Sequence, residues 1–224
     1  MKDSAALSQP EAWKRIQQLL GYTFKNDKLL QRALTHRSFS ADHNERLEFL
    51  GDSVLGLAVS DWLYNRLQDA PEGDLSRMRA NLVRQESLHG VALQLGLAQG
   101  LRLGEGELRS GGLQRASILA DALEATIGAI YLDAGYEAAQ KVVNHLFAQV
   151  DLNSNKLVAA KDPKTELQEW LQARKMPLPM YEVERIEGAA HQQTFHVVCM
   201  MESLQLRRTG QGSSRRAAEQ EAAR

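Results

Sequence analysis

Apolar residues recur every three to four positions from Pro10 to about Val150, a spacing that buries one face of an α-helix. Pro10 is placed to open the first helix, and Gly21 is placed to close it. This part of the chain contains no convincing strand pattern and no internal repeat. The pattern therefore predicts an all-α domain, with its last helices over residues 116–133 and 136–150.

Two segments interrupt this helical pattern. Residues 69–73 form a break, after which Asp74 or Ser76 could cap the next helix. Residues 100–112 hold five glycines among charged residues, and such a composition predicts a loop.

The composition changes at Asp151 and the periodicity changes after it. The polar run over residues 151–162 predicts a flexible linker between a domain over residues 1–150 and a second domain over residues 163–224. The second domain is expected to be α+β, in the order α-β-β-β-α. Its expected elements are a helix over 164–175, strands over 180–186, 194–201 and 204–209, and a helix that starts at Ser213 or Ser214.

Overall charge does not indicate a polyanion binder, because the 224 residues carry 27 Lys+Arg and 28 Asp+Glu. Residues 161–224 carry 10 Lys+Arg against 9 Asp+Glu, which leaves 17 against 19 for the rest, so any positive surface must be local. Cys199 is the only cysteine, which excludes an internal disulfide and fits a reducing compartment. The sequence has neither an apolar run of about 20 residues nor a signal peptide, so a cytoplasmic location without membrane attachment is expected.

Three carboxylates follow one another in the run N-E-R-L-E-F-L-G-D-S at residues 44–53. On a helix, Glu45, Glu48 and Asp52 fall within an arc of about 60°. Like charges this close repel one another, and clustered hard oxygens suit Mg²⁺ or Mn²⁺. A plain solvated helix face is the alternative. The opposite face is expected to be buried, and it carries Leu47, Leu50, Val54, Leu57 and Ala58.

A second acidic pair, Asp121 and Glu124, lies on a strongly apolar helix that is expected to be central in its domain. Gly128 follows on the same face, and Gly51 stands beside Asp52 in the first cluster. Glycine inside a helix costs about 1 kcal/mol relative to alanine, so both positions favour the close approach of another helix or a ligand. Five carboxylates on two core helices could then line one site.

Four segments together resemble the ribonuclease III family. They are A-L-T-H-R-S at residues 33–38, H-N-E-R-L-E-F-L-G-D-S at 43–53, E-G-E-L-R-S-G-G at 105–112 and S-I-L-A-D-A-L-E-A at 117–125. The resemblance runs from about Leu20 to the end of the chain. It is closest to short bacterial enzymes with an all-α nuclease domain followed by an α-β-β-β-α double-stranded-RNA-binding domain. Members of that family would continue the last helix with leucines, so its last turns are expected to be missing at Arg224, and the alternative is an unusually weak helix.

The resemblance implies an endoribonuclease that hydrolyses double-stranded RNA, such as ribosomal RNA precursors, and leaves 5′-phosphate and 3′-hydroxyl ends. It implies Mg²⁺ as the cofactor, with Mn²⁺ as a substitute, and no organic cofactor. Glu72 is either a further acid of the cleft or a surface residue. The implied metal ligands are Glu48, Asp121 and Glu124, and the implied catalytic acids are Asp52, Glu124 and Glu45.

Two kinds of partner are expected, double-stranded RNA and a second copy of the chain. Phe49 lies about 40° from Glu45 on the helix and away from the leucines, and the resemblance implies that this ring enters the partner subunit of a homodimer. Glu219 stands where the family usually has a third basic residue, which predicts weak RNA binding. The implied RNA contacts are Thr165, Gln168, Glu169, His191, Ser213, Ser214, Arg215 and Arg216.

Two other functions fit parts of the sequence. The first is a catalytically silent regulator that binds double-stranded RNA, and the intact acids argue against it. The second is a metal-dependent phosphohydrolase of small substrates, and the basic helix start at residues 213–216 argues weakly against it.

Overall fold

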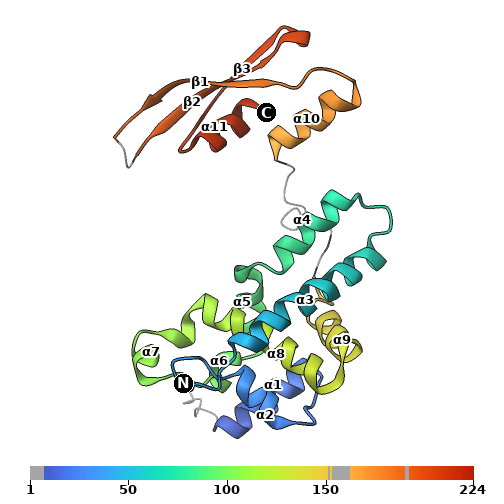
Figure 1. Ribbon diagram of the computed structural model, residues 1–224, viewed down its shortest axis with the longest axis vertical. Helices are drawn as coiled ribbons and strands as arrows, with labels where there is room; N and C mark the ends of the chain where they lie inside the picture. Colours follow the sequence, from blue (N-terminus) through green and yellow to red (C-terminus); the bar gives the residue numbers. More distant parts are fainter. Residues whose placement is uncertain (1–7, 151, 153–161, 190–191) are drawn as a thin grey trace, which may run out of the picture. The chain divides into compact units, whose positions relative to one another are not determined.

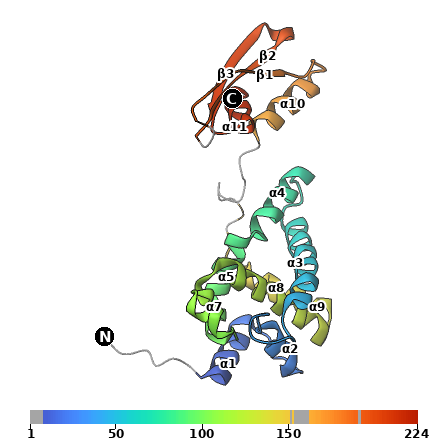
Figure 2. The ribbon, with the colours of Figure 1, turned by 60° about the vertical axis from the view of Figure 1, so that its left-hand side comes forward.

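The chain folds into two compact units, Met1–Val158 and Ala159–Arg224. The computed structural model describes residues 8–150, 152, 162–189 and 192–224, so His191 and most of the predicted linker lie outside the described residues. Figures 1 and 2 show a helical first unit and a second unit built on a sheet. No helix of the described chain is long and apolar enough to cross a membrane.

The described part of the first unit is helical, as predicted, apart from one isolated parallel bridge between Thr35 and Arg102. Pro10 lies in the first turn of the first helix, and Gly21 ends that helix with a φ of 66°. The α-helices are α1 (Gln9–Leu20), α2 (Asp27–Ala33), α3 (Glu45–Arg66), α4 (Glu72–Leu82), α5 (Gln85–Gln94), α6 (Leu97–Gly100), α7 (Glu105–Arg109), α8 (Ala116–Ala134) and α9 (Tyr136–Leu146), with a 3₁₀ turn, η1, at Gly112–Gln114.

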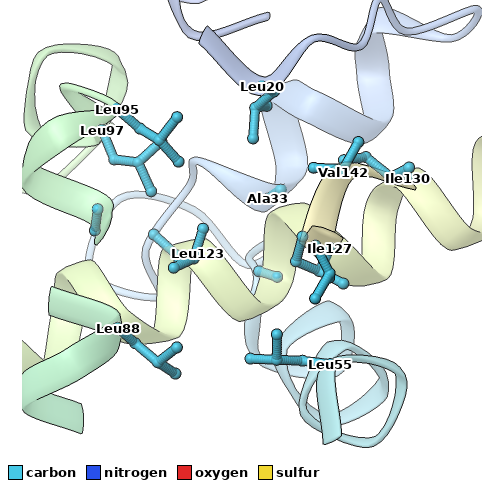
Figure 3. Packing of buried hydrophobic residues seen from close by; sticks show 14 of the residues in the cluster. Leu20, Ala33, Leu55, Leu88, Leu95, Leu97, Leu123, Ile127, Ile130 and Val142 are labelled. Carbon is cyan, nitrogen blue, oxygen red and sulfur yellow. The ribbon is translucent and has the colours of Figure 1, made fainter. Parts of the chain in front are cut away.

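Helix α8 is the centre of the first unit, as its apolar composition predicted. Its side chains are buried around most of its circumference, and helices α2, α3, α5 and α9 pack against it. Figure 3 shows Leu123 and Ile127 of α8 between Leu88 of α5 and Leu55 of α3 on one side and Ala33 of α2 on the other.

Helices α3 and α8 cross with their backbones in contact. A Cβ atom added to Gly51 would lie 1.8 Å from the carbonyl oxygen of Glu124, and one added to Gly128 would lie 2.3 Å from the carbonyl oxygen of Leu47. No other residue type fits at either position without moving a helix. The predicted reason for these two glycines, close approach of another helix, is confirmed.

The buried face of α3 was predicted only in part: Leu47, Val54 and Ala58 are buried as expected, but the face as a whole is displaced. Leu57 is 58% exposed and Leu50 is half-buried, whereas Leu55 and Val59 are buried. On a helical wheel the buried face is therefore centred nearer to the acids than the expected leucine stripe. The physical reason is that α8 contacts α3 on the side of Gly51, so the acids lie at the edge of the helix–helix contact instead of opposite it.

Three boundaries in the first unit also differ from the prediction. Helix α4 begins at Glu72, because Pro71 is extended and its carbonyl oxygen accepts the backbone N–H groups of Asp74 and Leu75. The glycine-rich segment 100–112 is not all loop, since α7 forms within it. Helix α9 ends at Leu146, four residues early.

The second unit has the predicted α-β-β-β-α order. Its antiparallel sheet has the strand order β1-β2-β3, with Val183 opposite Val197 and Val197 opposite Gly210. Its elements are α10 (Pro163–Ala173), β1 (Met180–Glu187), β2 (Thr194–Met201), a 3₁₀ turn, η2 (Glu202–Leu204), β3 (Leu206–Gly212) and α11 (Arg215–Ala222).

Small residues attach α11 to the sheet. A Cβ atom on Gly210 would lie 2.4 Å from the carbonyl oxygen of Ala218, and one on Gly212 would lie 2.5 Å from the backbone nitrogen of Ala218. Ala218 and Ala222 are fully buried against the strands. The third strand was predicted to end at residue 209, but it continues to Gly212. The reason is that Gly210 and Gly212 leave room on the strand for α11 to pack.

Candidate functional site

Three carboxylates from two helices converge beside the α3–α8 crossing. Glu48 of α3 and Asp121 and Glu124 of α8 each offer one oxygen, and these oxygens lie within 4.8 Å of one another. Glu48 precedes Gly51 by one turn, and Glu124 precedes Gly128 by one turn, so the close glycine crossing is what brings the acids together. Among the described residues, no other trio of His, Cys, Asp or Glu meets this spacing.

The three carboxylates are half-buried, and their pKa values are raised. Burial raises the pKa of the Glu124 carboxyl from its ordinary 4.5 to about 7, and neighbouring acids add to the effect, Asp52 most of all. Burial also raises the pKa values of Glu48 and Asp121, again with repulsion from nearby acids. Such a set of crowded hard oxygens fits a divalent cation, whose charge would remove the repulsion.

The other two acids of the predicted cluster lie outside the group of three. Glu45 is exposed and receives a hydrogen bond from Arg37 Nη1 at 3.2 Å. Asp52 is exposed one turn beyond Glu48, and its charge raises the pKa values of Glu48 and Glu124. Both therefore face the cluster at its rim, and their catalytic roles stay predictions.

A histidine that had been given no role lies at the same rim. The Nδ1 atom of His36 is 2.8 Å from Ser38 Oγ, which also accepts the backbone N–H of Gly104 at 3.0 Å. Burial lowers the pKa of the His36 imidazole, against an opposing effect of the Glu107 carboxylate. Segments 33–38 and 104–112 thus meet beside the acids. The residue spacing within segment 33–38 or segment 104–112 gave no indication that the two segments meet.

Glu72 lies in another part of the first unit. It accepts a hydrogen bond from Ser76 Oγ at 2.7 Å in the first turn of α4. Together with residues of α3 and α4 it lines a pocket of about 480 Å³. The other lining residues are Leu57, Ser60, Asp61, Leu63, Tyr64, Leu75, Ser76 and Arg79.

An apolar surface follows the outer side of α3, and we call it the α3 stripe. It consists of Phe49, Leu57 and Tyr64, which are 80%, 58% and 70% exposed. Single exposed apolar residues are common, but three large ones on one helix face, next to a pocket lined by the same helix, indicate an interaction surface.

The residues predicted to bind RNA lie on α10 and at the start of α11. Thr165 and Glu169 are exposed and Gln168 is half-buried, while Ser213 and Ser214 precede α11 and Ser214 caps it. Two acids hold the arginines. Arg215 Nε donates to Glu219 at 2.8 Å, and Arg216 lies 3.5 Å from Asp162.

The sequence matches the Ribonuclease-III-like family over residues 26–150 and the double-stranded RNA binding motif over residues 163–224. It is 63% identical over 214 residues to Ribonuclease 3 of Delftia acidovorans, which covers 96% of this chain and 94% of the relative. It is 64% identical over 208 residues to Ribonuclease 3 of Variovorax paradoxus, which covers 93% and 91% of the two chains.

Solved structures resemble the first unit. The nuclease domain of Ribonuclease III from Campylobacter jejuni superposes with a TM-score of 0.59 at 44% identity, covering 61% of this chain and 96% of that domain. That domain is described as flexible in a region involved in dimer formation.

Proposed function

Because this chain belongs to the ribonuclease III family, we propose that its acidic cluster holds the divalent cations with which it cuts double-stranded RNA. The chain is an endoribonuclease of double-stranded RNA, with a helical nuclease domain and a double-stranded-RNA-binding domain. The observation that carries the proposal is the convergence of Glu48, Asp121 and Glu124 within 4.8 Å.

The carboxylates suit Mg²⁺, with Mn²⁺ as a substitute, because both prefer oxygen ligands. A divalent cation supplies positive charge against the phosphodiester and lowers the pKa of a bound water. Glu48, Asp121 and Glu124 would hold the cation, and Glu124, whose pKa is raised to about 7, would have to be deprotonated to serve as a ligand. Asp52 orients the attacking water, and Glu45 completes the acidic rim. The resulting RNA ends are 5′-phosphates and 3′-hydroxyls.

Substrate binding falls to the second unit. Exposed side chains of α10, together with Ser213, Ser214, Arg215 and Arg216 before and within α11, contact phosphates and 2′-hydroxyls of the duplex. His191 remains an expected contact on the basis of the family resemblance. Structured transcripts in the cytoplasm, including ribosomal RNA precursors, are the proposed substrates.

The α3 stripe supports a homodimer. Leu57 and Tyr64 of α3 line the pocket. Phe49 lies on the same helix about four turns before Tyr64. If two α3 helices pack antiparallel about a twofold axis, the ring of one copy meets the pocket of the other, and the reverse contact forms by symmetry. Gly56 lies between these positions with open space beside it, so the two helices can approach closely there. A twofold dimer provides two acidic clusters for two RNA strands.

A labelled RNA duplex, incubated with purified protein in the presence of Mg²⁺, Mn²⁺ or EDTA, tests the proposal. We expect cation-dependent cutting of the duplex, with single-stranded RNA and duplex DNA left intact. Asp121→Asn should lose most activity while binding the duplex normally, and Glu86→Gln, which changes an exposed acid on α5, should cut like the wild type. Strong residual cutting by Asp121→Asn would remove Asp121 from the site. Binding without cutting in wild type under every cation would favour the silent regulator.

A further inference from the structure

Glu219 is a buried acid in the RNA-binding unit, at a position where a basic residue was expected. Only 8% of the residue is exposed. One carboxylate oxygen accepts a hydrogen bond from Lys164 Nζ at 2.5 Å, and the other accepts one from Arg215 Nε at 2.8 Å. The Lys164 ammonium also lies 4.3 Å from the centre of the Tyr181 ring. Glu219 therefore joins α11 to α10, and Lys164 extends the contact to β1.

Polar bridges accompany the apolar contact that Leu167 of α10 makes with the cluster around Ala222 of α11. Helix α11 packs closely on β2 and β3, whereas α10 and α11 approach each other at few backbone positions. Beside the Glu219 bridge, Asp162 at the start of α10 accepts a hydrogen bond from Gln220 of α11 at 2.6 Å. Side-chain bridges thus help to fix how the exposed face of α10 lies relative to the start of α11, and Figure 1 shows the two helices on the same side of the sheet.

The bridge also orients one arginine. Arg215 is 64% exposed, and its Nε is engaged by Glu219, so the remaining donors of the planar guanidinium are available to a ligand. Glu219 stays ionised: burial acts to raise its pKa, but the hydrogen bonds from Lys164 and Arg215 outweigh burial and lower it. This contact favours one orientation of the arginine before any ligand arrives.

We propose that Glu219 is a positioning residue for duplex binding, which presents Arg215 and fixes α10 against α11 so that both reach the RNA together. The inference rests on the proposed function, in which Arg215 and α10 contact RNA. In this account Glu219, at the position of the expected third basic residue, supports RNA binding by orienting Arg215 instead of weakening that binding by its charge.

Simple electrostatics predicts the opposite result, so the sign of one measurement separates the two accounts. A carboxylate near a polyanion repels it, and neutralising Glu219 should then tighten binding and steepen its salt dependence. If Glu219 positions Arg215, neutralising it should weaken binding and reduce the salt slope by up to about 0.9, the value for one lost phosphate contact.

The test compares full-length Glu219→Gln with Glu221→Gln, which removes the same charge from the same helix at an exposed site where the carboxylate lies 3.4 Å from the exposed Arg224. Duplex affinity is measured in EDTA at several salt concentrations, and cleavage is measured with Mg²⁺. We expect Glu219→Gln to lose about 3- to 10-fold in affinity with a smaller salt slope, and to raise KM at unchanged kcat. Glu221→Gln should bind as tightly as wild type or more tightly.

Two further variants keep the inference testable. Arg215→Lys keeps the charge but loses the planar fork, so it should weaken binding even if Glu219→Gln disturbs folding. Wild-type or tighter binding by both Glu219→Gln and Arg215→Lys would overturn the inference. The double change Arg215→Ala with Arg216→Ala tests the proposed RNA surface itself: if it alone weakens binding, the surface stands and the positioning role falls, and if it has no effect, the surface is wrong.

Discussion

Replacing Glu124 with glutamine should stabilise the cation-free protein while removing most cleavage. The reason is the raised pKa of this carboxyl, which burial and the neighbouring acids, with Asp52 first among them, bring to about 7. An ionised Glu124 is therefore unfavourable in the folded state. Glutamine keeps the size and helix propensity of the residue and removes the charge.

The sign follows from proton binding. Between pH 4.5 and about 7 the folded chain holds a proton at Glu124 that the unfolded chain has released, so the free energy of unfolding falls as pH rises through this window. The difference between the two pKa values corresponds to about 3 kcal/mol, and solvent screening at a half-buried site reduces the expected effect to about 1–2 kcal/mol. Above pH 7 the penalty is complete.

Urea unfolding in EDTA at pH 5 and pH 8 measures this effect. At pH 8 Glu124→Gln should be about 1–2 kcal/mol more stable than wild type, and the gain should largely vanish at pH 5. Added Mg²⁺ should stabilise wild type more than the variant, because the variant lacks one of the proposed ligands. Glu86→Gln on α5 is the matched control, since its carboxylate is 72% exposed, and it should show no gain.

Two outcomes would refute this reasoning. A variant that is less stable than wild type at pH 8 in EDTA would show that the Glu124 carboxylate is a structural acid with a stabilising partner. A gain that is equal at pH 5 and pH 8 would show that the stabilisation has nothing to do with ionisation. Near-normal cutting by Glu124→Gln would separately remove the residue from the catalytic site.

Three further changes test other parts of the first unit. Phe49→Asp should shift the chain from dimer to monomer in sedimentation, whereas Leu93→Asp, at an exposed leucine on α5, should not; a fully dimeric Phe49→Asp contradicts the proposed interface. Gly51→Ala should cost about 3 kcal/mol in urea unfolding because its Cβ meets the Glu124 carbonyl oxygen, while Gly90→Ala has open space and should gain up to about 1 kcal/mol. Asp133→Asn should lower the free energy of unfolding by about 1–2 kcal/mol near neutral pH, since the carboxylate accepts hydrogen bonds from Tyr22 Oη at 2.7 Å and from two backbone N–H groups. These bonds outweigh burial and lower the pKa of Asp133, so the difference should fade as pH falls below 4. An unchanged urea midpoint at pH 7 would exclude this role.

Periodicity predicted the kind of fold well, because each unit buries apolar residues at the spacing of its elements. The apolar run of α8 indicated a central helix, and the strand patterns around Val183 and Val197 indicated the sheet. Boundaries were less predictable where backbone chemistry competes with side-chain pattern. Pro71 caps α4 three residues before Asp74, the first of the two expected caps, and Gly210–Gly212 extends β3 because α11 needs the space that these glycines leave.

The face of α3 could not be read from its own residues. The helix carries large apolar side chains on nearly every side, so the wheel allowed more than one buried face. The position of α8 decides the matter, and it leaves Phe49, Leu57 and Tyr64 exposed. A leucine that the sequence assigned to the core thus belongs to the surface that we propose for the second subunit. A contact between chains would explain why three large apolar residues stay exposed together on one helix.

Helical spacing indicated the two groups of acids, but it could not show the contact between α3 and α8 that brings the two groups together. Gly51 and Gly128 let α3 and α8 touch, and this contact places Glu48 beside Asp121 and Glu124. The same contact buries the carboxylates, raises their pKa values and makes the cation-free cluster unfavourable. At the proposed site, a bound cation would offset the free energy that the crowded acids cost, so the glycines that weaken two helices would couple the stability of the domain to its cation.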